Sequence, residues 1–275
     1  HATQLAKQML SYFQGALPGG AAGDQRALRR MIPENRLRTY DVRPIIETLA
    51  DTATWMELRR NYAPGIVTGF ARIEGRPVGI IASDNTFLGG AVDCDGADKA
   101  SHMYQVCDAY DLPIMVLLDT PGFMVGPDSE RQAAVRKTSR LFVNGAKVGV
   151  PILNIVLRKA YGLGAMALAG GTLDRGMFSV AWPTGEFGGM GLEGMARLAT
   201  RRQVEAEPDP VKQKAIYDNA VARSYASGKA LRQAMSLQVD AVIDPADTRA
   251  WVLTALKAAA RRVDHGPRRP IVDAW

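Results

Sequence analysis

Histidine and cysteine are scarce in this chain, and several catalytic motifs are missing from it. Its 275 residues include three histidines, His1, His102 and His265, and two cysteines, Cys94 and Cys107. A Ser–His–Asp or Cys–His mechanism would have almost no histidine to use. The sequence has no CxxC, HExxH or GxxxxGK[ST] string, so we expect neither a metal site nor a P-loop. Two cysteines argue against a disulfide framework and favour a cytoplasmic location.

Long apolar runs are also absent, and the positive charge is not concentrated. No run approaches the roughly 20 residues that span a bilayer, so we expect no membrane segment. The formal net charge is +6, yet the basic residues occur as scattered pairs without interleaved aromatics. This distribution argues against a nucleic-acid partner. It suits a polyanionic small molecule such as a coenzyme A ester.

The hydrophobic pattern predicts an α/β fold in layers. Residues 66–84 alternate about Glu74-Gly75, which predicts a hairpin. Continuous apolar runs at 113–120, 151–158 and 177–183 are typical of strands buried on both faces. The segments between these runs predict helices, as in right-handed βαβ crossovers.

Helices are predicted at both ends of the chain and between the strands. Residues 1–31 predict two helices around a loop, with an apolar stripe that we expect to be covered by a partner. The remaining helices are predicted at 41–50, where Asp41 is the N-cap, at 98–110, 129–148 and 162–171, and from Asp209 to Arg262 around a short strand at 239–244.

Two glycine-rich segments follow predicted strands, RKAYGLGAMALAGG at 158–171 and LGGAVDCDG at 88–96. A helix that starts at a strand end presents unpaired N–H groups and a positive dipole end, and small residues let an oxygen approach them. Two such turns can form an oxyanion hole without any titrating side chain. The same glycines would also permit close helix–sheet packing, and their spacing alone leaves both interpretations open.

Other chemistries have weaker support. GLGAMA lacks the complete GxGxxG of a dinucleotide site and the acidic residue after the next strand. Asp84, Asp93, Asp119 and Glu186 lie near strand ends, where carboxylates more often cap a turn than move a proton. Glu186 is the candidate acid if the chain is a hydratase.

Five strings in order resemble the carboxyltransferase subunits of biotin-dependent acyl-CoA carboxylases, such as propionyl-CoA carboxylase β chains. They are YDVRPIIETLAD, IVTGFARIEGRPVGIIA, DGADKASHMYQVCDAYDLPIMVLLDTPGF, VLRKAYGLGA and AWPTGEFGGMGLEG. The resemblance implies a crotonase-like fold (a layered β-β-α spiral) and the carboxy-terminal, biotin-side half of such a subunit. It implies connector helices at 1–39 and a carboxyltransferase domain at 40–275.

The resemblance also implies a mechanism. Carboxybiotin on a carrier protein releases CO₂, the biotin nitrogen removes the α-proton of an acyl-CoA, and the enolate attacks the CO₂. The backbone N–H groups of Gly164 and Ala165 would face the biotin oxygen, while Arg158 and Lys159 would raise the local positive potential. The residues implied in binding biotin or acyl-CoA are Gly89, Gly90, Gly122, Phe123, Tyr161, Gly162, Leu163, Ala167, Gly188 and Gly189.

The turn departs from the commoner family pattern AYGGA, because this chain reads AYGLGA. The variant is similar to some long-chain or multidomain acyl-CoA carboxylases, and it leaves the amide donors open by one position. The implied partners are a biotin carboxyl carrier protein, a biotin carboxylase and an acyl-CoA-binding amino-terminal half, in a homo- or hetero-oligomer. A biotin-dependent acyl-CoA decarboxylase and a non-catalytic assembly half are the alternatives.

Overall fold

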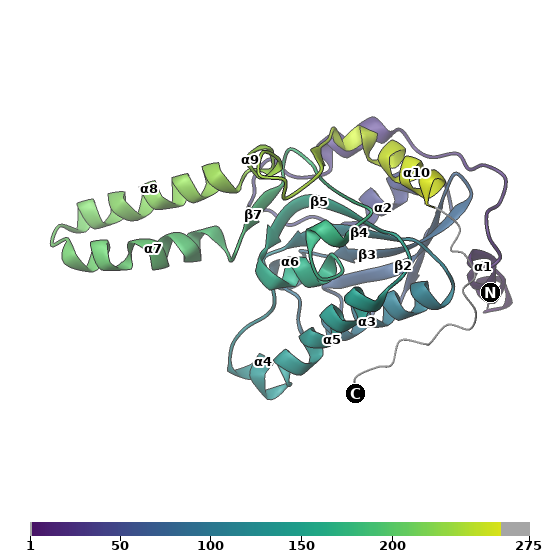
Figure 1. Cartoon of the computed structure of the whole chain (residues 1–275), viewed down its shortest axis with the longest axis horizontal. Coiled ribbons are helices and arrows are strands. Elements are labelled where there is room, and N and C mark those ends of the chain that lie inside the picture. Colours follow the sequence, from purple (N-terminus) through teal and green to yellow (C-terminus); the bar gives the residue numbers. More distant parts are fainter. Residues whose placement is uncertain (1, 260–275) are drawn as a thin grey trace.

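A computed structural model describes residues 2–259 as one mixed sheet covered by helices on both faces, with a helical arm at one end (Figure 1). The strands are β1 (Met56–Leu58), β2 (Ile66–Ile73), β3 (Arg76–Ser83), β4 (Ile114–Thr120), β5 (Ile152–Tyr161), β6 (Phe178–Ala181), β7 (Glu186–Gly188) and β8 (Ala241–Val242). Among these residues the sheet order is β1-β2-β3-β4-β5-β6-β8, and β7 pairs with the far end of β5. The predicted α/β class is confirmed.

The helices connect these strands and extend beyond them. The α-helices are α1 (Ala2–Tyr12), α2 (Arg43–Leu49), α3 (Cys94–Ala109), α4 (Pro127–Arg131), α5 (Ala134–Lys147), α6 (Gly162–Leu168), α7 (Leu192–Ala206), α8 (Pro210–Gly228), α9 (Ala230–Ala234) and α10 (Thr248–Ala258). The 3₁₀ turns are η1 (Gln25–Arg30), η2 (Leu88–Gly90), η3 (Leu173–Arg175) and η4 (Pro245–Asp247). Every helix within residues 2–259 is too short or too polar to cross a membrane.

The apolar runs form the centre of the sheet, as predicted. β2 and β3 pair antiparallel about Glu74-Gly75, and β3, β4, β5 and β6 are parallel. Successive side chains of β4 enter different cores: Ile114 and Val116 pack beneath α3 and α5, whereas Met115 and Leu117 pack beneath α2 and α10. Because both faces are covered, a strand in this position needs apolar residues without alternation.

Several predicted boundaries are wrong. The helix expected at 41–50 begins at Arg43 with Val42 as its N-cap, and Asp41, two positions before Arg43, accepts the Arg43 N–H. The helix expected at 129–148 is broken at Ala133, which has a φ of 59°. The helix expected at 162–171 ends at Leu168. Arg262, the expected end of the last helix, lies outside the described residues.

The amino-terminal helix is partly covered by this chain itself. Tyr12 is buried, and the rings of Tyr12 and Phe13 lie 5.5 Å and 5.4 Å from that of Phe70 on β2. Leu5 and Leu10 remain 39% and 59% exposed. The expectation that nothing in the chain covers this segment is therefore wrong for its carboxy-terminal end.

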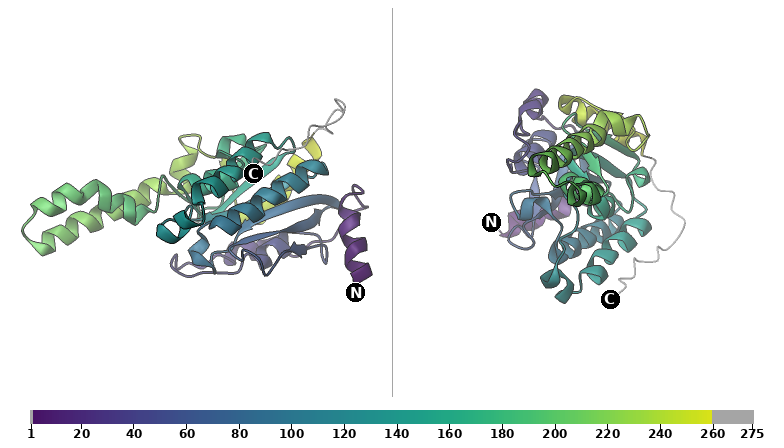
Figure 2. Two further views of the ribbon diagram at one scale, coloured as in Figure 1. Left: turned by 90° about the horizontal axis from the view of Figure 1, so that it is seen from below. Right: turned by 90° about the vertical axis from the view of Figure 1, so that its left-hand side faces the viewer.

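The α7–α8 hairpin forms an arm that projects from the body (Figure 2). Helix α7 was not predicted, since helices were expected only from Asp209 onward. Within the described chain, the buried arm residues are Leu192, Ala196, Thr200, Ala220 and Gly228. They are few for two helices of this length, and none lies in the last turn of α7 or the first turn of α8.

A buried lysine joins α3 to the loop before β2. Lys99 is 2% exposed, and its Nζ donates to the backbone carbonyls of Arg59, Tyr62 and Ala63 at 3.0, 2.7 and 3.3 Å. Burial lowers the pKa of Lys99 from 10.5 to about 8. The carbonyls compensate only part of the cost of burying the ammonium group.

Lys99 should therefore give the native protein a specific pH dependence. Between about pH 8 and pH 10.5 the unfolded chain binds more protons at this site than the folded chain, so stability rises with pH. The free energy of unfolding of the wild type, minus that of Lys99→Met, should increase across this interval by at most about 1.4 kcal/mol per pH unit. Urea denaturation at stepped pH measures this difference, and a constant difference would contradict the argument.

Candidate active site

Four glycine-bearing segments meet where β3, β4 and β5 end. The loop after β4 bonds to the segment after η2, because Val92 N–H donates to Gly122 O (2.9 Å) and Met124 N–H donates to Val92 O (2.8 Å). Gly122 also contacts the first turn of α6, and Gly162 contacts Gly189. The structure thus brings together the segments that hold the predicted residues Gly89, Gly90, Gly122, Phe123, Gly162, Leu163, Gly164, Gly188 and Gly189.

Gly164 marks the closest of these approaches. A Cβ atom at this position would lie 2.5 Å from the carbonyl carbon of Gly122 and 2.7 Å from the nitrogen of Phe123. Backbone atoms cannot move aside as a flexible side chain can, so only glycine lets α6 pack against the loop after β4. The packing role that the sequence left open for this glycine is therefore real.

The start of α6 determines which N–H groups are unpaired within the helix. Tyr161 is the N-cap and Gly162, with a φ of 58°, is the first helical residue. In this register the N–H groups of Gly162, Leu163 and Gly164 have no acceptor in the helix, whereas that of Ala165 is in register with the Tyr161 carbonyl. Strand β5 passes directly into the helix without a linker. The helix start therefore favours Leu163 and Gly164 as donors over Ala165.

The second glycine turn, η2, lies against the end of β4. Gly90 has a φ of 89°, and a Cβ there would lie 2.4 Å from the carbonyl oxygen of Asp119. The Nζ atom of Lys159 donates to the carbonyl oxygen of Gly89 at 2.7 Å, which links η2 to β5. Burial lowers the pKa of Lys159, against the opposing effect of the Asp119 carboxylate.

Two predicted residues serve the packing of the described chain. Ala167 is fully buried in the core beneath α6, so it does not line an open cleft. The exposed neighbour is Met166 (37%), which the sequence analysis did not single out. Phe123 is half-buried, and the centroid of its ring lies 6.3 Å from that of Phe142 on α5 in an edge-on arrangement.

A buried ion pair lies beneath these turns. Asp119 is fully buried, and its Oδ2 atom accepts from Arg158 Nε (3.1 Å) and Asn85 Nδ2 (2.8 Å). Its Oδ1 atom accepts from the backbone N–H of Lys159 (3.1 Å). Arg158 also donates to the carbonyl oxygens of Arg36 (3.2 Å) and Arg38 (2.8 Å). Arg158 is 4% exposed and neutralised, so it does not supply the free positive potential that was expected of it.

A second polar cluster surrounds Glu186. The Oε2 atom of Glu186 accepts from the Tyr161 hydroxyl (2.7 Å) and from Arg36 Nη2 (2.8 Å). Tyr161 is 3% exposed. No local sequence pattern points to Arg36, because it lies in a polar connector 150 residues away from Glu186.

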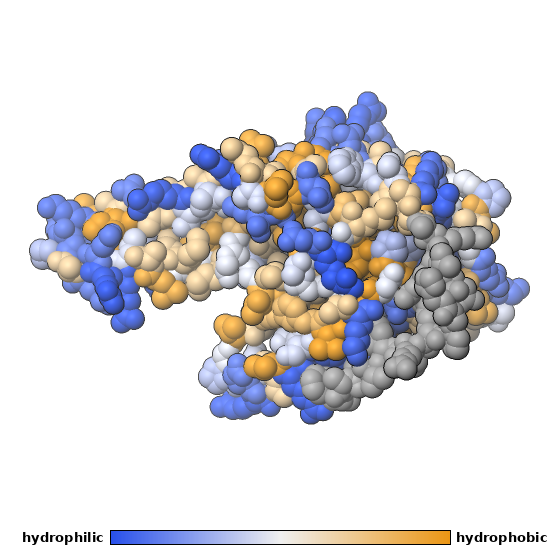
Figure 3. Space-filling view, in the orientation of Figure 1, coloured by the Kyte–Doolittle hydropathy of each residue, from blue (hydrophilic) through white to orange (hydrophobic). Residues whose placement is uncertain are grey.

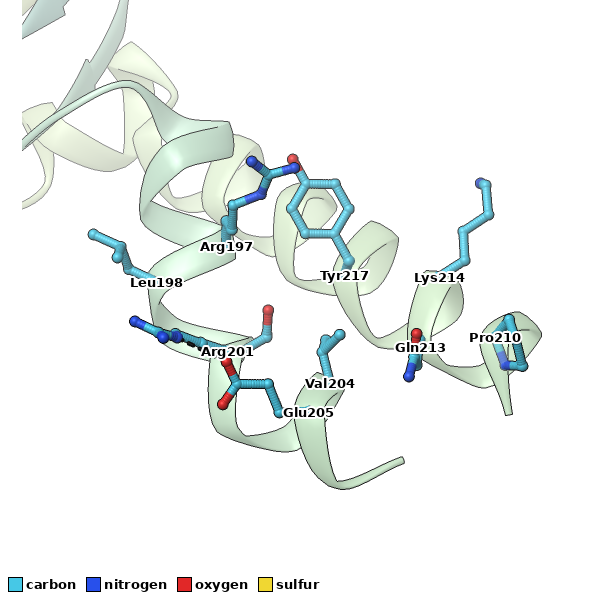
Figure 4. Close-up of a pocket in the computed structure, with 10 residues that line it drawn as sticks. Arg197, Leu198, Arg201, Val204, Glu205, Pro210, Gln213, Lys214 and Tyr217 are labelled. Carbon is cyan, nitrogen blue, oxygen red and sulfur yellow. Dashed lines mark hydrogen bonds and ion pairs between the residues drawn. The ribbon is translucent and has the colours of Figure 1, made fainter. Parts of the chain in front are cut away.

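No cluster of three or more His, Cys, Asp or Glu residues suited to a metal ion occurs within residues 2–259. A groove of about 650 Å³ lies between α7 and α8, where Figure 4 shows Arg197, Arg201 and Tyr217 along its walls. It belongs to the arm rather than to the glycine turns.

Arg158→Met should lower the free energy of unfolding by about 3–5 kcal/mol, because it leaves the Asp119 carboxylate buried without its cation. The double variant Arg158→Met/Asp119→Leu should recover most of that loss. Arg201→Met is the matched control, since its ion pair with Glu205 is exposed and worth less than about 1 kcal/mol. Urea denaturation measures all three, and equal losses for Arg158→Met and Arg201→Met would contradict the prediction.

The comparisons with known proteins agree on one family. A model of the carboxyl transferase domain matches residues 2–269. The methylmalonyl-CoA carboxyltransferase 12S subunit of Propionibacterium freudenreichii subsp. shermanii is 33% identical, over 96% of this chain and 52% of that protein. The propionyl-CoA carboxylase beta chain of Saccharopolyspora erythraea is 30% identical, over 93% of this chain and 47% of that one.

The solved structures give the same result. One, described as a single-chain, multi-domain long-chain acyl-CoA carboxylase, is 51% identical with a TM-score of 0.85, over 92% of this chain and 25% of that chain. The transcarboxylase 12S hexamer is 30% identical with a TM-score of 0.84, over 97% of this chain and 53% of that chain. This chain spans about half the length of the curated relatives it matches. The resemblance and the crotonase-like fold are confirmed, and the chain belongs to the carboxyl transferase domain family.

Proposed function

We propose that this chain forms the biotin-facing half of an acyl-CoA carboxyltransferase, which transfers a carboxyl group from carboxybiotin to the α-carbon of an acyl-CoA. The observation that carries the proposal is the meeting of two glycine turns, η2 after β3 and the start of α6 after β5, on either side of the end of the parallel strand β4. Family membership supports the reaction class. Neither a histidine nor a metal cluster is needed for this chemistry.

The residues present suit the ureido group of biotin. An added Cβ at Gly89 in η2 or at Gly189 after β7 would meet no atom within 4 Å, so there is open space beside η2 and beside the loop that contacts Gly162. The N–H groups at the start of α6 suit a ureido oxygen, and the helix dipole favours negative charge on it. The nearby Glu186 carboxylate is neutralised by Arg36, which limits its repulsion of such an oxygen.

When bound, carboxybiotin supplies the carboxyl group as CO₂ and then a base for the α-proton of the acyl-CoA. The part of this chain is to hold oxygen atoms by backbone donors, with Gly164 central and Leu163 beside it. Such donors are fixed before the reaction, so they stabilise developing charge without reorganisation. Lys159, held at Gly89, adds positive charge near the same turns.

The surface around the turns is apolar, which suits a buried reaction site. The exposed apolar residues of these segments are Leu88, Met124, Val125, Leu163, Met166 and Met190. Figure 3 shows apolar surface over α6 and in the recess between the arm and the α4–α5 region. Exposed apolar patches of this kind mark binding surfaces. We propose that the acyl-CoA-binding half, on the same or another subunit, covers this recess.

The proposed partners follow from the reaction. They are a biotin carboxyl carrier protein and a biotin carboxylase, within an oligomer such as the hexamer described for the transcarboxylase 12S relative. We also propose a cytoplasmic location, which suits the two free, buried cysteines.

The direct test uses the full-length protein that contains this chain. It is mixed with biotinylated carrier protein, biotin carboxylase, ATP, labelled bicarbonate and a panel of acyl-CoAs. We expect acid-stable label on at least one acyl-CoA. No labelled product with any acyl-CoA would overturn the proposed function and favour an assembly role.

Gly164→Ala should lower kcat by about 10²–10³, the usual effect of losing an oxyanion donor. Its Cβ would separate α6 from the loop after β4 and displace the donors. Gly23→Ala is the matched control, because a Cβ there meets no atom within 4 Å. Both variants are assayed after their melting temperatures confirm folding. Unchanged turnover in Gly164→Ala would show that this turn does not supply the donors.

A further inference from the structure

Arg36 contacts both the arm and the cluster beside the α6 turn. Its guanidinium carbon lies 3.4 Å from the centroid of the Tyr225 ring on α8. Its Nη2 atom lies 2.8 Å from Glu186 Oε2 on β7. Only a planar guanidinium can stack on a ring and donate in its own plane at the same time. Arg36 thus joins two parts of the chain that are far apart in sequence.

From Glu186 the contacts continue to the first residue before α6. The oxygen that accepts from Arg36 also accepts from the Tyr161 hydroxyl at 2.7 Å. Burial, together with the hydrogen bond to Glu186, raises the pKa of Tyr161, so the hydroxyl stays protonated and remains a donor. Tyr161 is the N-cap of α6, and the proposed donors follow it directly.

Strand β7 strengthens this link through its backbone. It pairs in parallel with the end of β5, so that Glu186 lies opposite Lys159 and Gly188 opposite Tyr161. A shift of Glu186 would therefore move both the Tyr161 hydroxyl bond and the strand pairing beside the turn. Strand β7 is therefore joined to the residue before α6 both by backbone pairing and by a side-chain hydrogen bond.

The base of the arm contacts β7. A Cβ at Gly228, the last residue of α8, would lie 2.6 Å from the carbonyl oxygen of Phe187 on β7. The Tyr225 hydroxyl donates to Glu193, which joins α8 to α7 beneath Arg36. Because the buried residues of the arm are few, its orientation depends on these basal contacts.

We propose that Arg36 is a positioning residue that couples the α7–α8 arm to the start of α6 through Glu186 and Tyr161. A displacement of the arm then displaces the backbone donors, and a partner that fixes the arm also fixes them. The coupling rests on the contacts above. Its meaning for catalysis rests on the proposed function, which assigns the donors to this turn.

The first test measures amide hydrogen exchange in the full-length protein without substrate or carrier. Arg36→Ala should speed exchange at the base of the arm and also in residues 165–168, whose N–H groups are the first to be hydrogen-bonded within α6. Arg38→Ala is the matched control, since its side chain is exposed on the same connector. Faster exchange in the arm alone would show that the arm and the turn are uncoupled, and would overturn the proposal.

The second test separates positioning from general destabilisation. Tyr161→Phe removes one hydroxyl and keeps the ring, and Arg36→Lys keeps the charge without the planar stack. Each should lower kcat for carboxyl transfer about tenfold, with KM for acyl-CoA changed less than about twofold, since misplaced donors weaken the transition state alone. The kcat of the double variant Arg36→Ala/Tyr161→Phe should be no lower than that of the more impaired of its two single variants, Arg36→Ala and Tyr161→Phe.

Independent, multiplicative losses in the double variant would overturn the coupling, as would full kcat in Arg36→Ala. If wild-type protein carboxylates no acyl-CoA, the proposed function fails. The exchange measurement then still decides whether Arg36 couples the arm to the turn, so the two failures are distinguishable.

Discussion

The buried pair of Asp119 and Arg158 holds together the place where the parallel strands end. Asp119 is the last residue but one of β4, Arg158 lies near the end of β5, and Asn85 comes two residues after the end of β3. Arg158 also binds two carbonyls of the connector, which fixes that connector over the strand ends. Buried charges are costly unless every donor and acceptor is paired. The ion pair thus fixes three strand ends and the connector at one point. The glycine turns that follow these strands are thereby held in a defined arrangement.

The turns themselves are made of backbone, which explains the composition of the site. Gly164 and Gly90 let one chain segment press against another at distances that no side chain would permit. N–H groups held this way carry fixed dipoles and need no proton transfer. A chain with few histidines can therefore support enolate-type chemistry, provided that its partners bring the reacting base and carboxyl group.

The sequence predicted the sheet well, because its centre depends on local patterns. The hairpin about Glu74-Gly75 and the buried runs of β4 and β5 follow from alternation and apolar length alone. Helix ends were less predictable: the break at Ala133 rests on a left-handed residue of a type that usually favours helices. The arm helix α7 was missed because its mixed sequence has few residues that pack inside the chain.

The site was predictable in its glycines but not in its supporting charges. The turns at 88–90 and 162–164 are visible as small residues after strands, and the ordered family strings strengthened that interpretation. The link of Arg36 with Glu186 joins residues 150 positions apart, and no local pattern announces it. Side chains that hold a backbone site in place are chosen by the tertiary arrangement, so they become visible only once that arrangement is known. The proposed amide donors belong to single turns, whereas the contacts that we propose to align them extend from the connector through β7 to the arm.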